Sequence, residues 1–127
     1  MPLKDCDEKL IDQSLAAAIE VHRELGPGLL ESVYEHAFML ELEAAGIPAE
    51  RQVEVPAQYR GHILDIGFRA DIIVNDCLLL EIKSVSDLSD LHLAQVITYL
   101  KLLQFKRGFL LNFNTKFLKD GIKRVSI

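Results

Sequence analysis

The sequence predicts an α/β (or α+β) fold in which helices flank a mixed sheet. Two observations carry this prediction. Amphipathic helical patterns open the 127-residue chain and return after residue 85, whereas alternating or continuous apolar patterns typical of strands fill residues 52–83 and 109–127. The predicted order is helix, helix, three antiparallel strands, helix, strand, strand, which buries one sheet against helices. We expect a single domain over residues 1–127.

The first two helices are expected at residues 7–25 and 29–45. Gly26-Pro27-Gly28 separates them, because Gly tolerates positive φ and Pro cannot continue a helix. His22 lies on the apolar stripe of the first helix, where a packed core histidine is more usual than a ligand. The predicted core stripes are Ile11, Leu15, Ala18, Ile19, His22 and Leu25 in the first helix, and Leu30, Val33, Ala37, Leu40 and Ala44 in the second.

The remaining segments complete the sheet and one further helix. Residues 52–59 alternate as a half-exposed strand, and Pro56 favours an edge position or a bulge because it lacks an amide donor. A second strand is expected at residues 63–74, a capped third helix from about residue 90 to Gln104, and further strands at residues 109–113 and 122–127. The third helix carries a narrow polar stripe that can simply face water. Its members are His92, Gln95 and Tyr99.

Residues 69–85, RADIIVNDCLLLEIKSV, form the predicted hairpin on which the function depends. Two apolar runs flank the turn-forming pair Asn75-Asp76. Asp71 lies on the first run, and Glu81 and Lys83 lie on the second. Burying unpaired charges is costly, so three of them in a buried hairpin indicate chemistry.

The spacing of these charges predicts the loop. Side chains alternate along a strand, so Glu81 and Lys83 share one face. Asp71 joins that face only if the sum of paired residue numbers is even, as when it lies opposite Glu81. A two-residue loop gives an odd sum, so we expect a three-residue loop at residues 75–77, or a bulge.

Composition bounds the location and the partners. No apolar run reaches the length of a membrane span and the N-terminus lacks an apolar signal core, so we expect a cytoplasmic protein without membrane contact. Cys6 and Cys77 belong to no CxxC pair, and we interpret both as free thiols. The net charge is −5, but residues 101–127 hold seven Lys or Arg against one Asp. This basic segment is either a solvated face or a patch that faces phosphates.

An Asp and a Glu on neighbouring strands offer oxygen ligands to Mg²⁺ or Mn²⁺. Lys83, on the same face, would orient an attacking water and offset charge on a phosphate oxygen. The alternative is a cross-strand ion pair of Glu81 or Asp71 with Lys83, which needs no metal. A glycoside hydrolase is a distant option, because the chain has no Trp for sugar stacking.

These residues also carry a family resemblance. Asp71 followed by Glu81-Ile82-Lys83 resembles the D…(D/E)xK signature of the PD-(D/E)XK nuclease superfamily. Residues 28–34, GLLESVY, are similar to the pattern of the GxxExxY family, a group of small proteins assigned to that superfamily. The resemblance extends from about residue 11 to residue 127 and implies a restriction-endonuclease-like core of αβββαβ order.

The resemblance also implies residue roles. It makes Asp71 and Glu81 ligands of Mg²⁺ or Mn²⁺ and Lys83 the catalytic lysine. Further metal ligands would be the Ile82 carbonyl and Glu31, and the substrate-binding residues would be Gln95, Tyr99 and Arg69.

The function that we expect is a metal-dependent nuclease acting on nucleic acid, on DNA in preference to RNA. The alternative is a non-catalytic module that binds nucleic acid or protein and retains the nuclease fold. Because specific protein–DNA interfaces commonly bury ~1,000 Å² or more, a core of this size is expected to need a homodimer or a partner protein.

Overall fold

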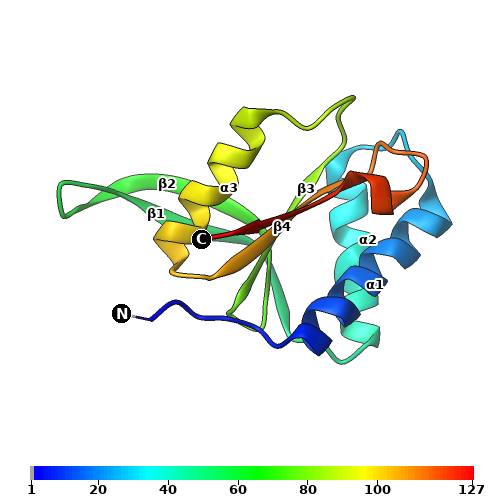
Figure 1. The fold of residues 1–127 in the computed structure, drawn as a ribbon, viewed down its shortest axis with the longest axis horizontal. Helices are drawn as coiled ribbons and strands as arrows, with labels where there is room; N and C mark the ends of the chain where they lie inside the picture. Colours follow the sequence, from blue (N-terminus) through cyan, green and yellow to red (C-terminus); the bar gives the residue numbers. More distant parts are fainter. Residues whose placement is uncertain (1) are drawn as a thin grey trace.

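The computed structural model describes residues 2–127 and confirms the predicted class and element order. Two helices precede three antiparallel strands, a third helix and two further strands (Figure 1). The elements are α1 (Glu8–Leu25), α2 (Glu31–Ala44), β1 (Ala49–Tyr59), β2 (His62–Val74), β3 (Leu78–Lys83), α3 (Asp90–Leu103), β4 (Arg107–Asn112), the short 3₁₀ helix η1 (Leu118–Gly121) and β5 (Ile122–Ser126).

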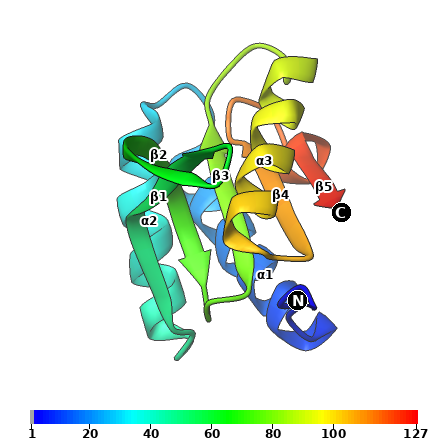
Figure 2. The same cartoon turned by 90° about the vertical axis from the view of Figure 1, so that its left-hand side faces the viewer.

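The five strands form one mixed sheet in the order β1-β2-β3-β4-β5. The β3–β4 pair is parallel and the other three pairs are antiparallel. Helices α1 and α2 pack on one face of the sheet and α3 packs on the other (Figures 1 and 2). The parallel pair follows from α3, because a crossover helix returns the chain to the same end of the sheet. Among residues 2–127, no helix is both long and apolar enough to cross a membrane.

The core stripe of α2 differs from the prediction. Leu30 and Leu40 are 74% and 68% exposed, whereas Tyr34, Phe38 and Leu42 are fully buried. The helix therefore turns its aromatic stripe inward, and the aliphatic stripe at 30, 33 and 40 faces outward. Aromatic side chains bury more area than Leu, and the Tyr34 hydroxyl finds partners inside, so this orientation is the more stable one.

Helix α1 shows a smaller difference from its predicted stripe. Ile19 and Leu25 are exposed, and Ala17 and Val21 lie in the core instead. His22 is buried as predicted, and its Nε2 lies 2.7 Å from the carbonyl oxygen of Thr115.

Strand β1 lies at the edge of the sheet, as Pro56 predicts, and its register against β2 shifts between Pro56 and Gln58. Beyond this shift, β1 and β2 continue as a two-stranded ribbon that projects away from the rest of the sheet (Figure 1). Tyr59, Ile63 and Ile66 are exposed on this ribbon. Where the ribbon begins, β2 turns away from β3, and the site described below lies at this point.

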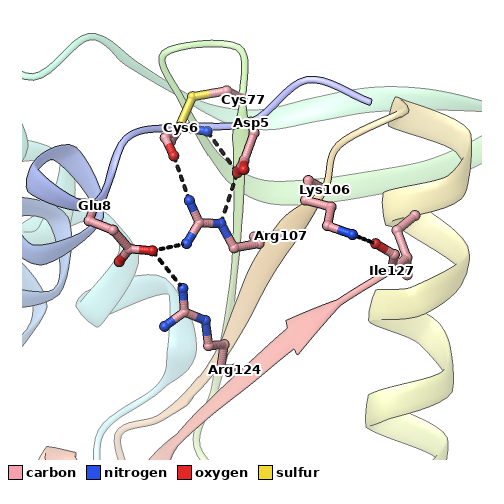
Figure 3. A network of polar contacts seen from close by, with 8 residues as sticks. All are labelled: Asp5, Cys6, Glu8, Cys77, Lys106, Arg107, Arg124 and Ile127. Carbon is pink, nitrogen blue, oxygen red and sulfur yellow. Dashed lines mark hydrogen bonds and ion pairs between the residues drawn. A yellow bond between two sulfur atoms is a disulfide. The ribbon is translucent and has the colours of Figure 1, made fainter. Parts of the chain in front are cut away.

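The interpretation of two free thiols is wrong, because Cys6 and Cys77 form a disulfide with Cα atoms 5.5 Å apart (Figure 3). The segment before α1 lies against the connection between α3 and β4, where Lys4 forms a parallel bridge with Phe105. This docking carries Cys6 to the β2–β3 loop, although the two cysteines are 71 positions apart in sequence. Sequence spacing contains no signal for such a contact.

The basic C-terminal segment is partly neutralised by the same docking (Figure 3). The Arg107 side chain is only 11% exposed and pairs with Asp5, at 2.8 Å, and with Glu8. Glu8 also pairs with Arg124 at 3.1 Å. These two arginines are therefore withdrawn from any phosphate-facing patch, and the lysines of the segment remain.

Candidate active site

The β2–β3 hairpin places Asp71 and Glu81 side by side. The ladder pairs Val74 with Leu78 and ends at the pair Ile72–Leu80, so the paired numbers have an even sum. The loop has three residues, 75–77, as predicted. Asp71 and Glu81 are the next residues along the two strands, at the point where β2 leaves β3 for the projecting ribbon.

The two carboxylates replace the backbone bonds that the diverging strands lose. The Asp71 amide donates to Oε2 of Glu81 at 2.8 Å, and the Ile82 amide donates to Oδ2 of Asp71 at 2.8 Å. Each side chain thus uses one oxygen to bind the backbone of the opposite strand. The second oxygens, Oδ1 of Asp71 and Oε1 of Glu81, are left for other partners.

Burial and mutual repulsion make this pair electrostatically unfavourable. Glu81 is only 3% exposed, and burial followed by the charge of Asp71 raises its pKa to about 9. Burial also raises the pKa of Asp71, against the hydrogen bond from the Ile82 amide, which lowers it. The positive charge of Lys83 lowers the pKa of both carboxyls, but the net direction is upward. Strongly perturbed carboxyls in a strand gap are typical of functional sites.

Two residues that the sequence reasoning missed extend the site on the β1 side. Glu35 of α2 is buried, and both of its oxygens accept from Nε2 of Gln52, at 3.0 and 2.9 Å. The same nitrogen lies 3.5 Å from Oδ1 of Asp71, and the charge of Glu35 raises the pKa of Asp71. Gln52 has φ +52°, a strained conformation for a non-glycine residue in a strand. The sequence pattern gives no signal for these contacts, because they join residues of α2, β1 and β2.

Lys83 and residues of α3 form the other side of the candidate site. Lys83 lines a cavity of about 500 Å³ together with His92 and Gln95 of α3. Tyr99, one turn further along α3, is buried, and its ring centroid lies 5.0 Å from that of Phe68. Burial and then the charges of Glu81 and Asp71 raise the pKa of the Tyr99 phenol. The structure thus brings the predicted Gln95 and Tyr99 to the carboxylate side of the sheet.

The alternative of a cross-strand ion pair is not realised. Among residues 2–127, the ion pairs do not include Lys83 with either Asp71 or Glu81. The lysine influences both carboxyls through space while its side chain faces the cavity.

Among residues 2–127, Glu31 does not gather with Asp71 and Glu81 into a group of three that could hold a metal. Oε2 of Glu31 accepts a hydrogen bond of 2.9 Å from the backbone amide of Ser84, directly after β3. The Ser84 hydroxyl in turn donates to the carbonyl of Leu29 at 2.7 Å. Glu31 therefore joins the start of α2 to the end of the strand that carries Glu81 and Lys83.

Tyr34 completes this connection. Its hydroxyl donates to the carbonyl of Gly26 at 2.6 Å and accepts from the amide of Leu29 at 3.1 Å. Its ring stacks on Phe113 with centroids 4.5 Å apart. Gly28 has φ +93°, which a residue with a Cβ adopts only with strain. Glu31 and Tyr34 thus connect α2 to the end of β3 and to the α1–α2 loop, and Gly28 provides the turn in that loop.

Arg69 lies outside this arrangement. Its guanidinium is exposed and forms an ion pair of 3.3 Å with Glu54 on β1. Both residues line a pocket of about 300 Å³ between β1 and β2.

Comparison with known families decides the classification. The family model described as PD-(D/E)XK nuclease superfamily matches residues 8–125. The chain belongs to the PD-(D/E)XK nuclease superfamily. No curated protein and no solved structure matches it. The five-stranded mixed sheet with flanking helices is consistent with the restriction-endonuclease-like fold of this superfamily.

Nucleases of this superfamily typically use divalent metals, and the donor set of this PD-(D/E)XK chain fits one in chemistry. Asp71 and Glu81 each keep one oxygen that is not bonded to the backbone, and their charges repel each other without a cation between them. Such a carboxylate pair suits a hard ion that retains several waters. Among residues 2–127, no group of three or more carboxylate, imidazole or thiolate side chains gathers as a metal site. The protein ligands would therefore be few.

Proposed function

We propose that this protein is a metal-dependent nuclease that hydrolyses phosphodiester bonds in nucleic acid. The observation that supports the proposal is the pair Asp71–Glu81 at the β2–β3 separation, with Lys83 two residues further along the same face. Superfamily membership supports nuclease activity in general, and the residue roles are our assignment.

In this proposal Asp71 and Glu81 would hold Mg²⁺ or Mn²⁺, and the Ile82 carbonyl would be a further ligand. When bound, such an ion polarises the scissile phosphate and lowers the pKa of a bound water. Asp71 and Glu81 are preorganised for this role, because the backbone amides fix their carboxylate planes.

The other residues act through position and charge. The Lys83 ammonium would orient the attacking water and offset charge that develops on a phosphate oxygen. Gln95 and Tyr99 would line the substrate path along α3. We assign Glu31 a positioning role in place of metal ligation, because its carboxylate holds the Ser84 amide at the end of β3.

We further assign the chain to the GxxExxY group within the superfamily. The local structure at Gly28, Glu31 and Tyr34 supports this assignment, because each residue of the pattern has a distinct structural task there. The task of Glu31 and Tyr34 is to anchor the α1–α2 loop and the end of β3, next to the catalytic lysine.

Cleavage assays test the proposal directly. Purified protein is incubated with Mg²⁺ or Mn²⁺ and with single-stranded, duplex and branched DNA and with RNA, and products are resolved by gel. We expect metal-dependent cleavage, on DNA in preference to RNA, that Glu81→Ala and Lys83→Ala both abolish. Glu54→Gln, at an exposed ion pair, is the control and should cleave as the wild type does. Cleavage that survives both site substitutions would contradict the proposal, and metal-dependent binding without turnover would favour a binding module.

We also propose that a second copy or a partner protein extends the nucleic-acid surface. The projecting ribbon supports this, because Tyr59, Ile63 and Ile66 are exposed on it. Light scattering of the wild type and of Ile66→Lys, which places a positive charge on the exposed apolar ribbon, is the test. A wild-type protein that is strictly monomeric and binds no nucleic acid would count against the proposal.

A further inference from the structure

A groove on the α1 side of the sheet carries a second cluster of residues suited to nucleic acid. It has a volume of about 560 Å³, within the range of small-ligand sites. The last turns of α1 form one wall and the segment before and within η1 forms the other. Its lining residues are Ile19, His22, Arg23, Gly26, Lys116, Phe117, Leu118 and Lys119.

Phe117 is the apolar centre of this groove. Its side chain is 55% exposed, although aromatic residues elsewhere in this chain mostly lie in the core. Nζ of Lys116 lies 5.6 Å and Nζ of Lys119 lies 5.9 Å from the ring centroid. A flat apolar ring thus lies beside two cations, and a ligand that suits it must offer both a flat face and negative charge.

The charge of the groove is available to a ligand. Among residues 2–127, Lys116 and Lys119 take part in none of the ion pairs, whereas Arg107 and Arg124 of the same basic segment are neutralised by acidic side chains. Arg23 pairs with Glu20 at 2.8 Å and remains largely exposed. The two lysines are therefore the cations free to meet phosphates.

The groove is joined to the candidate active site by a short chain of contacts. Asn112, the last residue of β4, lies in register with Lys83. Its side-chain amide donates to the carbonyl of Val85 at 3.0 Å, and its Oδ1 accepts from the Val85 amide at 3.1 Å. Three residues later, the Thr115 carbonyl meets His22 at the groove wall. In Figure 1 the orange segment after β4 lies beside the C-terminal end of α1, at the end of the sheet where β3 also ends.

We infer that this groove binds single-stranded nucleic acid, with one unpaired base stacked on Phe117 and the adjoining phosphates held by Lys116 and Lys119. Base stacking on an aromatic side chain beside basic residues is the usual design of single-strand binding sites. A duplex keeps its bases stacked on one another and cannot offer one to Phe117. Binding in the groove does not depend on the proposed nuclease function. The inference rests on that function only for its consequence, which is that the groove directs the enzyme to single-stranded or frayed substrates.

The test is a binding measurement that requires no cleavage. A fluorescent oligonucleotide is titrated in EDTA with the wild-type protein and its variants, and anisotropy gives the affinity. Separate arms use single-stranded DNA, single-stranded RNA of the same sequence, duplex DNA and a mononucleotide. Phe117→Ala is expected to weaken single-strand binding by roughly tenfold. The control is Leu40→Ala, an exposed apolar residue of α2 that does not line the groove, and it should leave the affinity unchanged.

The lysines are tested by salt dependence. Lys119→Ala should reduce the slope of log affinity against log salt by about one charge for all single strands. Lys9→Ala, in the first turn of α1 and away from the groove, should not. Circular dichroism verifies that each variant is folded, and the exposure of Phe117 makes its substitution structurally mild.

The outcomes separate this inference from the proposed function. Equal single-strand affinities for Phe117→Ala and Leu40→Ala overturn the inference, even if the wild type cleaves nucleic acid. Loss of binding in Phe117→Ala alone supports it, even if no cleavage is found. Tighter binding to duplex than to single strands, unaffected by Phe117→Ala, would also overturn it.

Discussion

Replacing Glu81 by Gln should stabilise the metal-free protein at neutral and higher pH. Glu81 is buried beside Asp71, and its pKa rises from the ordinary value of 4.5 to about 9. Between these two values the folded protein holds a proton that the unfolded chain has released. The folded state therefore binds more protons than the unfolded state, and the free energy of unfolding falls as the pH rises through this window. Gln has no such proton, but its amide oxygen still accepts from the Asp71 amide.

The expected magnitude follows from the width of that window. One pKa unit corresponds to about 1.4 kcal/mol, and about 2.5 units separate the ordinary value from pH 7. The proton that Glu81 takes up on folding therefore costs the metal-free fold up to about 3 kcal/mol at pH 7. Glu81→Gln should remove most of this cost, so that the variant is more stable than the wild type at neutral pH and nearly equal to it near pH 4.5.

Urea unfolding in EDTA at about pH 5 and about pH 8 measures this difference. The stability advantage of Glu81→Gln should grow between the two pH values, whereas Glu54→Gln, which alters an exposed carboxylate, should follow the wild type at both. Parallel curves for wild type and Glu81→Gln would refute the electrostatic reasoning.

Metal addition reverses the comparison. If Asp71 and Glu81 hold Mg²⁺ or Mn²⁺, a saturating ion binds the native state and raises the stability of the wild type, by about 3 kcal/mol at a concentration a hundred times the dissociation constant. Glu81→Gln should gain little from the same ion. Equal stabilisation of both proteins would exclude Glu81 as a ligand.

Three further predictions concern Tyr34, the disulfide and Lys83. Tyr34→Phe leaves two backbone groups of the α1–α2 loop without their partner and should cost about 2–4 kcal/mol of stability in urea unfolding, whereas Tyr59→Phe on the exposed ribbon should cost nothing measurable. Reducing the Cys6–Cys77 disulfide frees a loop of 71 positions and should lower stability by up to about 4 kcal/mol, with Cys6→Ser insensitive to reductant. Lys83→Met should lower the cleavage rate roughly a hundredfold or more while substrate affinity changes little, and a proportional loss of both would assign Lys83 to binding alone.

The sequence alone determined the fold class and the placement of Asp71 beside Glu81. Hydrophobic periodicity predicted the element order, and the parity argument predicted the three-residue loop that sets Asp71 beside Glu81. Both succeed for the same reason: a strand alternates with a period of two, so short spacings along the chain translate directly into sides of a sheet. His22 as a core residue and Pro56 at an edge strand also followed from local chemistry.

Tertiary structure alone decided which of two helix faces is buried and which distant residues meet. In α2 the stripes at 30, 33 and 40 and at 34, 38 and 42 both suit a helix. The sheet selected the second because the Tyr34 hydroxyl finds backbone partners there. Glu35 of α2 accepts a hydrogen bond from Gln52 of β1, and Cys6 forms a disulfide with Cys77, 71 positions away. Such contacts depend on packing in three dimensions, and no periodicity along the chain encodes them.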